Sequence, residues 1–432
     1  MICDMKKNLL FVALAGSLLA GCSSSDVETT YENEVLANRQ VPVMFGTYLG
    51  NTADTRAGNG KTGAVTTANL SEKHFGVFAY YTQNADYAAG IAPNFMYNEE
   101  VSSTDGTTWT YAPLKYWPNE LGSAGDGKGA TSVNKNRVSF FAYAPFVGKT
   151  DGTNAYQDDL QENNKEVGIT GFVANNATDE PYVTYRVATD AKNAVDLVWA
   201  KAENQTKKAT SEKVMFTFNH ALSRIQLMAQ AAFDVVGGTA NADPATADTQ
   251  TGSLGTQDAA TKIYINKVDI KATDMTVANK FNLVSGTWST VAGDMTSETT
   301  TLSVPRTNIN ATLKSAAAGV TTTETAIVAQ ENNEDQYFMI IPKADLELEI
   351  TIDYDIETAD PALAGKLTDG TTNGIKMNNV VKKTKKITFE AGKSYKLKLM
   401  IGLTDVEFSA SVANWTDADP VNVVWLPINT ES

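Results

Sequence analysis

Apolar residues in this chain alternate with polar residues at a period of two, and this pattern limits the fold more than any other feature. Such alternation places one face of a β-strand in a core, whereas an amphipathic helix needs a period near 3.6. In residues 346–354, acidic and threonine side chains alternate with aliphatic ones, as in a strand with one wet face. Related apolar stretches recur at 75–80, 138–143, 182–187, 214–218, 262–265, 337–341 and 395–399. The sequence therefore predicts an all-β fold with little helix, although residues 221–231 fit either period.

The predicted strands form two halves of similar size. The 432 residues exceed what one core usually holds, so two domains are expected. The polar, lysine-rich stretch 201–213 separates the halves, and Thr/Gly/Asn/Asp-rich segments such as 232–260 and 357–379 are interpreted as long surface loops. The lysine cluster 382–386 is interpreted as a solvated hairpin tip. We predict one β-sandwich over 57–210 and a second over 211–432.

The N-terminus has the pattern of an export signal. Lys6 and Lys7 precede the short apolar run 9–20, which is followed by Gly21 and Cys22. A positive segment, a short apolar segment and small residues at the cut are typical of a cleavable signal peptide. A cysteine directly after Leu-Ala-Gly predicts a lipoprotein: residues 1–21 are the signal, and lipid is attached at Cys22. The alternative is an ordinary signal peptide with a chance cysteine.

Composition excludes several classes of partner and site. The formal net charge of −15 disfavours nucleic acid and anionic lipid surfaces. The two cysteines are Cys3, inside the signal, and Cys22, so no intrachain disulfide is expected in the mature protein. The two histidines, His74 and His220, are far apart and lie inside apolar patterns, which favours core positions over a metal site or a catalytic triad. The sequence predicts no catalytic residue, no metal ligand and no cofactor.

Tryptophans and acidic residues offer two weaker signals. Exposed tryptophans could stack on sugars, but their apolar surroundings favour core packing; the four are Trp109, Trp117, Trp199 and Trp288. Acidic residues are plentiful enough for glycoside cleavage, which needs a pair of carboxylates. Nothing in the sequence marks out such a pair.

Residues 41–49 are predicted to form a first strand that can be removed. The apolar residues expected on one face are Val41, Val43, Phe45 and Leu49. A polar segment follows, in which Arg56 precedes Ala57, an exposed basic site of the kind that trypsin-like proteases cut. A cut after Arg56 would detach the propeptide 22–56 with this strand and the lipid, whereas a cut at Arg39 would leave the strand in place. Loss of the strand would open an apolar groove with unpaired backbone groups.

The last apolar stretch is a candidate to fill such a groove. It is apolar on both sides, and its key residues are Val421, Val423, Trp425 and Ile428. One reading is a final strand folded into its own domain. The other is strand addition to a neighbouring molecule, which builds a head-to-tail filament because the contact does not close on itself.

At this point the chain resembles the fimbrillins, subunits of the type V pili of Bacteroidetes. The likeness covers nearly the whole length and rests on the order and spacing of short pieces: the Cys22 lipobox, Thr55-Arg56-Ala57, 111–118 (YAPLKYWP), 138–145 (VSFFAYAP), 216–223 (FTFNHALS), 281–288 (FNLVSGTW), 338–342 (FMIIP), 391–395 (AGKSY) and 412–415 (VANW). The resemblance implies two transthyretin-like β-sandwiches, export as an outer membrane lipoprotein, surface cleavage by an Arg-specific protease, and polymerisation by strand exchange into extracellular fimbriae. It also implies a structural role for His220.

The resemblance leaves the role within a fimbria open. A shaft subunit needs both a removable first strand and a donor tail, and this chain has candidates for both. An anchor would keep its lipid, and a tip would lack a useful tail or carry a binding domain. The expected partners are other copies of the chain, related pilins, and a host glycan or protein receptor. A monomeric surface lipoprotein that binds glycans is the alternative from another functional class.

Overall fold

In the part of the chain that the structure describes, nearly all regular secondary structure is β-strand. The computed structural model describes residues 41–49, 62–118, 120–122, 133–148, 160–174, 180–208, 211–231, 261–305, 325–327, 330–331, 334–335, 337–402, 406–415 and 424–425. Its described helices are the single turn α2 (Leu70–Lys73) and the 3-10 turns η1 (Ala191–Asn193) and η3 (Ala292–Asp294). None of these is long and apolar enough to cross a membrane. The all-β prediction is confirmed.

A six-stranded sheet forms the centre of the N-terminal half. Its strands, in spatial order, are β14 (Asn219–His220), β12 (Val198–Gln205), β7 (Arg137–Ala144), β2 (Phe75–Gln83), β3 (Met96–Ser103) and β4 (Trp109–Thr110). Both faces are buried: Phe75 and Phe140 belong to one core cluster, while Phe78 and Phe141 belong to another. Burial on both faces explains why β2 and β7 are nearly continuous apolar runs rather than alternating ones.

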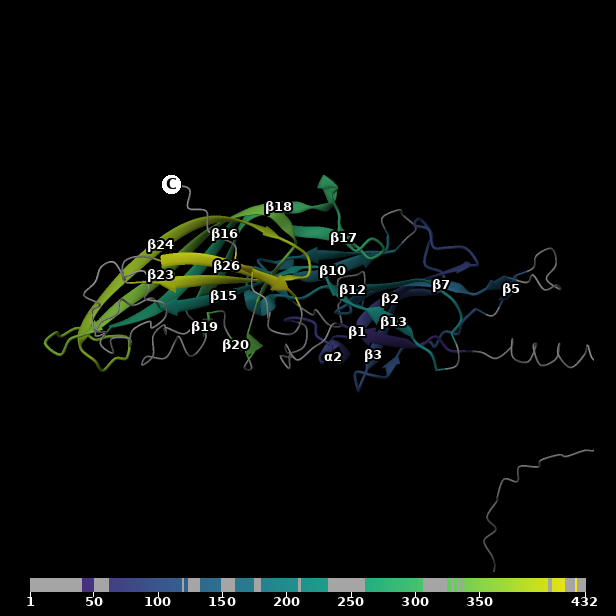
Figure 1. The fold of residues 1–432 in the computed structure, drawn as a ribbon, viewed down its shortest axis with the longest axis horizontal. Coiled ribbons are helices and arrows are strands. Elements are labelled where there is room, and N and C mark those ends of the chain that lie inside the picture. The colour runs from purple at the N-terminus through teal and green to yellow at the C-terminus, as the bar shows by residue number, and fades with distance from the viewer. Residues whose placement is uncertain are drawn as a thin grey trace, which may run out of the picture. The chain divides into compact units, whose positions relative to one another are not determined.

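One core of this half lies between the six-stranded sheet and a two-stranded parallel sheet. The smaller sheet consists of β1 (Phe45–Tyr48) and β13 (Val214–Thr217). Figure 1 shows β1 and β13 side by side near β2 and β3. The sheet therefore joins a segment from the start of the described chain to one that lies in its middle.

A seven-stranded sheet connects the two halves. The strands in order are β10 (Gly168–Val173), β11 (Tyr182–Arg186), β16 (Thr261–Asn282), β23 (Lys343–Ala359) and β24 (Gly374–Phe389); β17 (Thr287–Trp288) and β18 (Thr296–Pro305) also pair with β16. The 22-residue strand β16 pairs with β11 near its C-terminal end and with β23 along its N-terminal part. Strands from both sides of the expected boundary thus share one sheet. The division into 57–210 and 211–432 stays a prediction.

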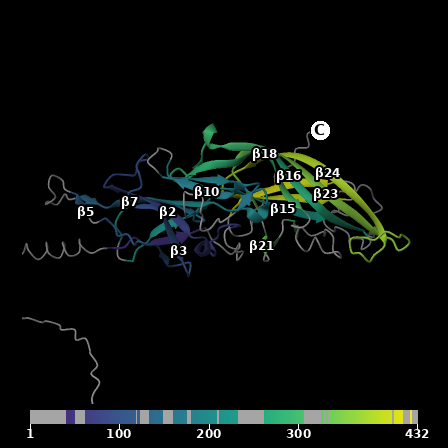
Figure 2. The same cartoon turned by 180° about the vertical axis from the view of Figure 1, so that it is seen from behind.

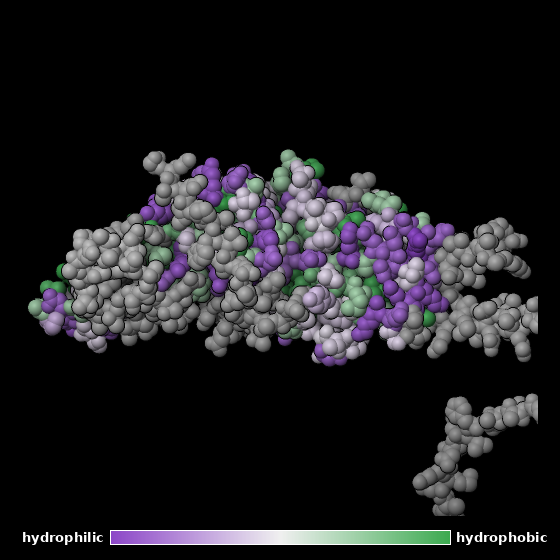
Figure 3. All heavy atoms as spheres, viewed as in Figure 1, coloured by the Kyte–Doolittle hydropathy of each residue, from purple (hydrophilic) through white to green (hydrophobic). Residues whose placement is uncertain are grey.

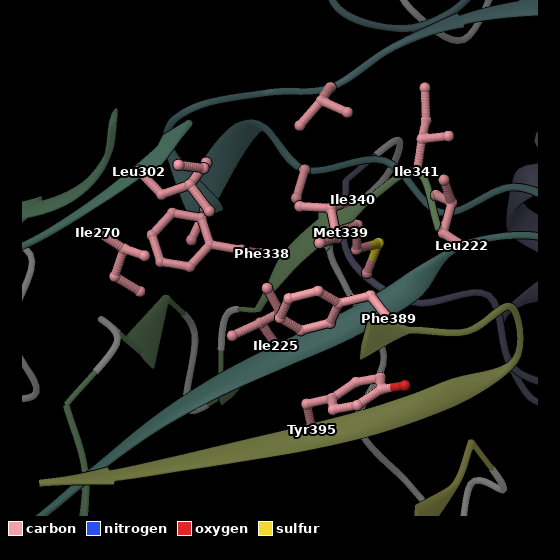
Figure 4. Packing of buried hydrophobic residues seen from close by; sticks show 14 of the residues in the cluster. Leu222, Ile225, Ile270, Leu302, Phe338, Met339, Ile340, Ile341, Phe389 and Tyr395 are labelled. Carbon is pink, nitrogen blue, oxygen red and sulfur yellow. The ribbon is translucent and has the colours of Figure 1, made fainter. Parts of the chain in front are cut away.

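A third sheet packs against the seven-stranded one. Its strands are β19 (Thr325–Ala326), β15 (Ser223–Ala231), β25 (Lys393–Ile401), β26 (Val406–Asn414) and β27 (Val424–Trp425), with β22 (Phe338–Ile340) also paired to β15. In Figures 1 and 2 the long strands β16, β23 and β24 lie over β15. Figure 4 shows the core between them, where Ile270 and Leu302 of one sheet approach Phe338 and Ile225 of the other.

Short hairpins complete the described strands. They pair β5 (Glu120–Gly122) with β6 (Val133–Lys135), β8 (Gln161–Glu162) with β9 (Lys165–Glu166), and β20 (Gln330–Glu331) with β21 (Glu334–Asp335). On the face in Figure 3, hydrophobic residues of the described chain lie in small patches among hydrophilic ones. Scattered patches of this kind are common on folded proteins and mark no particular site.

The structure corrects two expectations from the sequence and resolves a third that was ambiguous. The lysine cluster 382–386 is not a hairpin tip: it lies within β24, where Lys382 and Lys386 form ion pairs with Glu349 and Glu347 of β23. The loop expected over 357–379 is shorter, because β23 runs to Ala359 and β24 begins at Gly374. Most of residues 221–231, which fitted either period, form the strand β15.

Candidate strand-exchange site

The candidate site is the segment 41–49, which is hydrogen-bonded to backbone on both sides. On one side β1 pairs in parallel with β13, from Phe45 opposite Val214 to Tyr48 opposite Thr217. This pairing extends at each end, because Val214 N donates to Met44 O (2.7 Å) and Phe218 N donates to Tyr48 O (2.8 Å).

The other side of the segment contacts residues 115–117 in antiparallel fashion. Val43 N donates to Lys115 O and Trp117 N donates to Val41 O, both at 2.9 Å, around a bridge between Pro42 and Tyr116. The Tyr111 hydroxyl donates to Val43 O at 2.8 Å. Segment 41–49 therefore lies between two neighbours as an inner strand does.

Side chains on one face of the segment are buried in the core beneath it. The exposed fractions are 7% for Val41, 0% for Val43, 1% for Phe45 and 4% for Leu49, whereas Tyr48 on the opposite face is 47% exposed. The alternation of apolar and polar residues in this segment therefore matches the observed burial of its side chains. Whether the segment can leave stays a prediction.

Phe45 lies among four other aromatic rings. The distances from its ring centroid are 5.3 Å to Phe216, 5.5 Å to Tyr111, 5.6 Å to Phe140 and 6.3 Å to Phe75. The rings come from β13, β7 and β2 and from the segment that follows β4. Phe45 consequently packs both against the paired strand β13 and against the six-stranded sheet.

Burial of this face is large on the scale of domain stability. Burying one such side chain stabilises a fold by roughly 1.5–3 kcal/mol, so four contribute on the order of 6–12 kcal/mol. A whole domain is stable by only about 5–15 kcal/mol. An N-terminal half that lost this segment would be marginal until another strand replaced it.

Only part of the candidate donor tail lies in the described chain. Strand β27 pairs with β26 of the same chain, with Val424 opposite Val412 and Trp425 opposite Ser411. Val421, Val423 and Ile428 lie outside the described residues, as do Cys22, Arg56 and Ala57. The described part of the tail is therefore folded onto its own chain.

A buried cluster that was missed in the sequence joins Asp196, His220 and Trp415. The His220 Nδ1 atom lies 2.7 Å from Asp196 Oδ2, and the same oxygen accepts from Val65 N at 3.0 Å. The His220 ring stacks on Trp415 with centroids 4.0 Å apart and planes 6° apart. Asp196 is fully buried. The cluster connects Val65, the segment before β12 that contains Asp196, strand β14 with His220, and Trp415 directly after β26.

The sequence had singled out His220 but not its contacts with these partners. Trp415 ends the short piece 412–415 that the sequence comparison singled out, whereas Asp196 stands in no recognised piece; because the three residues are separated along the chain, no local pattern groups them. The other histidine, His74, is half-buried and lies 2.6 Å from Glu100 Oε1. Within the described ranges, no group of three or more His, Cys, Asp or Glu side chains could hold a metal ion.

Comparisons with known proteins agree with this architecture. The fimbrillin-like family model matches residues 55–415. A fimbrial protein from Bacteroides vulgatus ATCC 8482 shares the fold with a TM-score of 0.58 at 21% identity, over 88% of this chain and 100% of that chain. None of the curated proteins compared with the chain matches it.

Two candidate cell adhesion proteins of known structure are more distant. The one from Bacteroides ovatus ATCC 8483 has a TM-score of 0.45 at 14% identity, over 88% of this chain and 100% of its own. The one from Bacteroides uniformis ATCC 8492 has a TM-score of 0.41 at 17% identity, over 87% of this chain and 99% of its own. Because the family model spans most of its length, the chain belongs to the fimbrillin-like family and is a structural fimbrial protein, not an enzyme.

Proposed function

We propose that this fimbrial subunit forms the shaft of an adhesive fimbria by strand exchange. The precursor is exported as a lipoprotein through Cys22 and is cleaved after Arg56 by an Arg-specific protease. Cleavage releases residues 22–56, including the segment 41–49, so the lipid that holds the precursor at the outer membrane is lost. The tail of another copy, with Val421, Val423, Trp425 and Ile428, then fills the groove.

The observation that carries this proposal is the burial of segment 41–49 as an inner strand. Its backbone contacts two neighbours, and its apolar face fills a core. It is joined to the rest of the fold through residues 50–61, which include Arg56. A cut there would remove a strand of the core without removing any other described strand. Both proposed exchange segments also lie outside residues 55–415, the part of the chain that the family model matches.

A second reading has an observation in its favour. The pairing of β27 with β26 suits a tail that stays in its own sheet, as in a tip subunit or a monomeric glycan-binding lipoprotein. The two readings differ in whether the tail is needed by a neighbouring molecule. If a neighbouring molecule needs the tail, protein that lacks the tail should not polymerise.

The test is limited trypsin treatment of the purified chain 22–432. We expect a new N-terminus at Ala57 and a ladder of protease-resistant oligomers on denaturing gels run without heating. Trypsin also cuts after lysine, so the double variant Arg56→Ala/Lys61→Ala, which removes both trypsin sites of residues 50–61, should block both, while Arg39→Ala should block neither. A chain that lacks Val421–Ser432 should be cut and stay folded by circular dichroism, but form no ladder. Cleaved wild-type protein that remains monomeric would overturn strand exchange, and ladders from the truncated chain would overturn the donor assignment.

A further inference from the structure

An open pocket lies beside the hairpin of β16 and β17, away from the strand-exchange site. Its volume is about 400 Å³, within the range of roughly 300–1,000 Å³ that small-molecule sites occupy. Side chains from β11, β16, β17 and η3 line it, among them Tyr182, Lys280, Asn282, Trp288 and Asp294. The pocket thus lies where paired strands of the seven-stranded sheet meet the turns before and after β17.

Two aromatic side chains form rigid parts of its wall. Trp288 is fixed because its Nε1 donates to Ala221 O at 2.8 Å and its ring packs against Phe281 at 5.0 Å. Tyr182 is half-buried, and Lys280 Nζ lies 4.5 Å from the centre of its ring. A wall whose side chains are held in place before binding loses little entropy when a ligand binds.

The charged groups of the pocket neutralise one another. Lys280 Nζ and Asp294 Oδ1 lie 2.9 Å apart, and Asp294 Oδ2 accepts from the Ser289 hydroxyl at 2.7 Å. Hydrogen bonds from Lys280 and Ser289 lower the pKa of Asp294, and the bond to Asp294 is the main cause of the raised pKa of Lys280. Both groups are therefore ionised at neutral pH, and together they add no net charge.

This combination limits the chemistry of a ligand. An anion would meet the Asp294 carboxylate, and a cation would meet the Lys280 ammonium. A wholly apolar molecule would remove these polar groups from water without replacing their hydrogen bonds, which is costly. A neutral molecule with an apolar face and several hydroxyls satisfies both the aromatic rings and the polar groups.

We propose that this pocket binds a neutral pyranose unit of a saccharide. The C–H face of the sugar packs on the ring of Tyr182 beside Trp288, and its hydroxyls donate to Asp294 and accept from Lys280. None of these residues belongs to segment 41–49 or to the tail. Saccharide binding and strand exchange can therefore succeed or fail independently.

The test uses the uncleaved chain 22–432 and methyl glycosides of glucose, galactose, mannose and N-acetylglucosamine as probes, with glucuronate as a charged comparator. We expect saturable binding of at least one neutral glycoside, seen by saturation-transfer NMR and by tryptophan fluorescence. Glucuronate should bind more weakly because its carboxylate faces Asp294. Tyr182→Ala and Asp294→Asn should each weaken binding by about tenfold or more.

The matched control is Asp269→Asn, which breaks another surface ion pair, Lys267 Nζ–Asp269 Oδ2 at 2.6 Å, outside the pocket. It should leave binding unchanged, and thermal unfolding should show that all three variants are folded. The proposal fails if no neutral glycoside binds saturably at millimolar concentration, if binding survives Tyr182→Ala and Asp294→Asn, or if glucuronate binds best. Ladder formation after trypsin, measured on the same variants, keeps the two proposals apart.

Discussion

Among single residues, Phe45 contributes most visibly to holding segment 41–49 in place. Replacing Phe45 by Ala removes its contacts with four rings and should lower the free energy of unfolding by about 3–5 kcal/mol. Chemical denaturation of the uncleaved chain measures this loss. The shortened side chain should also let the segment leave more readily, so trypsin should cut after Arg56 faster.

Tyr48→Ala is the matched control for this change. Tyr48 is an aromatic residue of the same strand, but its side chain points away from the core and is 47% exposed. Its replacement should change the unfolding free energy by no more than about 0.5 kcal/mol. Equal losses for the two variants would mean that the aromatic cluster does not hold the segment.

The sequence predicted some residues of the candidate site but not the strand with which they pair. The period of two in residues 41–49 was sufficient to place Val41, Val43 and Phe45 on one buried face, because alternation is a local property of a strand. The partner strand could not be found in this way. Parallel pairing with Val214–Thr217 depends on contacts between residues that are distant in the chain, and no local pattern records them.

At the scale of elements, β24 forms an edge of the seven-stranded sheet. Among the described strands it pairs with β23 alone. Lys383 and Lys385 lie opposite Ile350 and Leu348, so their side chains are on the core face of this edge. Lysines in such positions hinder a further strand from pairing with an edge, because the added strand would help to bury their charges.

The double variant Lys383→Val/Lys385→Val should therefore associate through β24. We expect concentration-dependent dimers or larger species of the uncleaved chain in size-exclusion chromatography with light scattering. The control, Lys382→Val/Lys386→Val, makes the same chemical change on the opposite face and should remain monomeric. If both variants associate equally, added hydrophobicity alone is the cause and the core-face lysines have no special part.

The same strand shows where prediction of elements from sequence reaches its limit. Strands with one solvent-exposed face or with two buried faces could be predicted from the sequence, because burial requires apolar side chains at regular positions. Residues 382–386 looked like a turn since four of five are lysines. In the fold, Glu347 and Glu349 of β23 compensate part of this charge, and that pairing is a property of the sheet rather than of the segment.

At the scale of the whole molecule, the formal net charge of −15 sets how easily copies approach one another. Subunits that join head to tail bring like charges together, and salt screens this repulsion: the Debye length falls from about 30 Å at 0.01 M to about 8 Å at 0.15 M ionic strength. Ladder formation by trypsin-treated protein should therefore accelerate as sodium chloride rises over this range.

Gel densitometry at intervals after trypsin is quenched gives this rate separately from the rate of cleavage. Glycerol at matched osmolality, in place of the salt, should have no such effect. A rate that falls with added salt would show that attraction between specific charged groups, rather than general repulsion, governs the encounter.

The covalent connection of segment 41–49 through residues 50–61 has a further consequence for the order of events. While the connection is intact, a segment that leaves its site returns by a unimolecular step, at an effective concentration that dilution cannot lower. Once the connection is cut, its return becomes bimolecular, and its occupancy falls as the released peptide diffuses away. Which strand occupies the groove then depends on the local concentrations of the released peptide and of the tails of neighbouring molecules. Growth of a filament would favour crowded surfaces, where neighbouring tails outnumber released peptides.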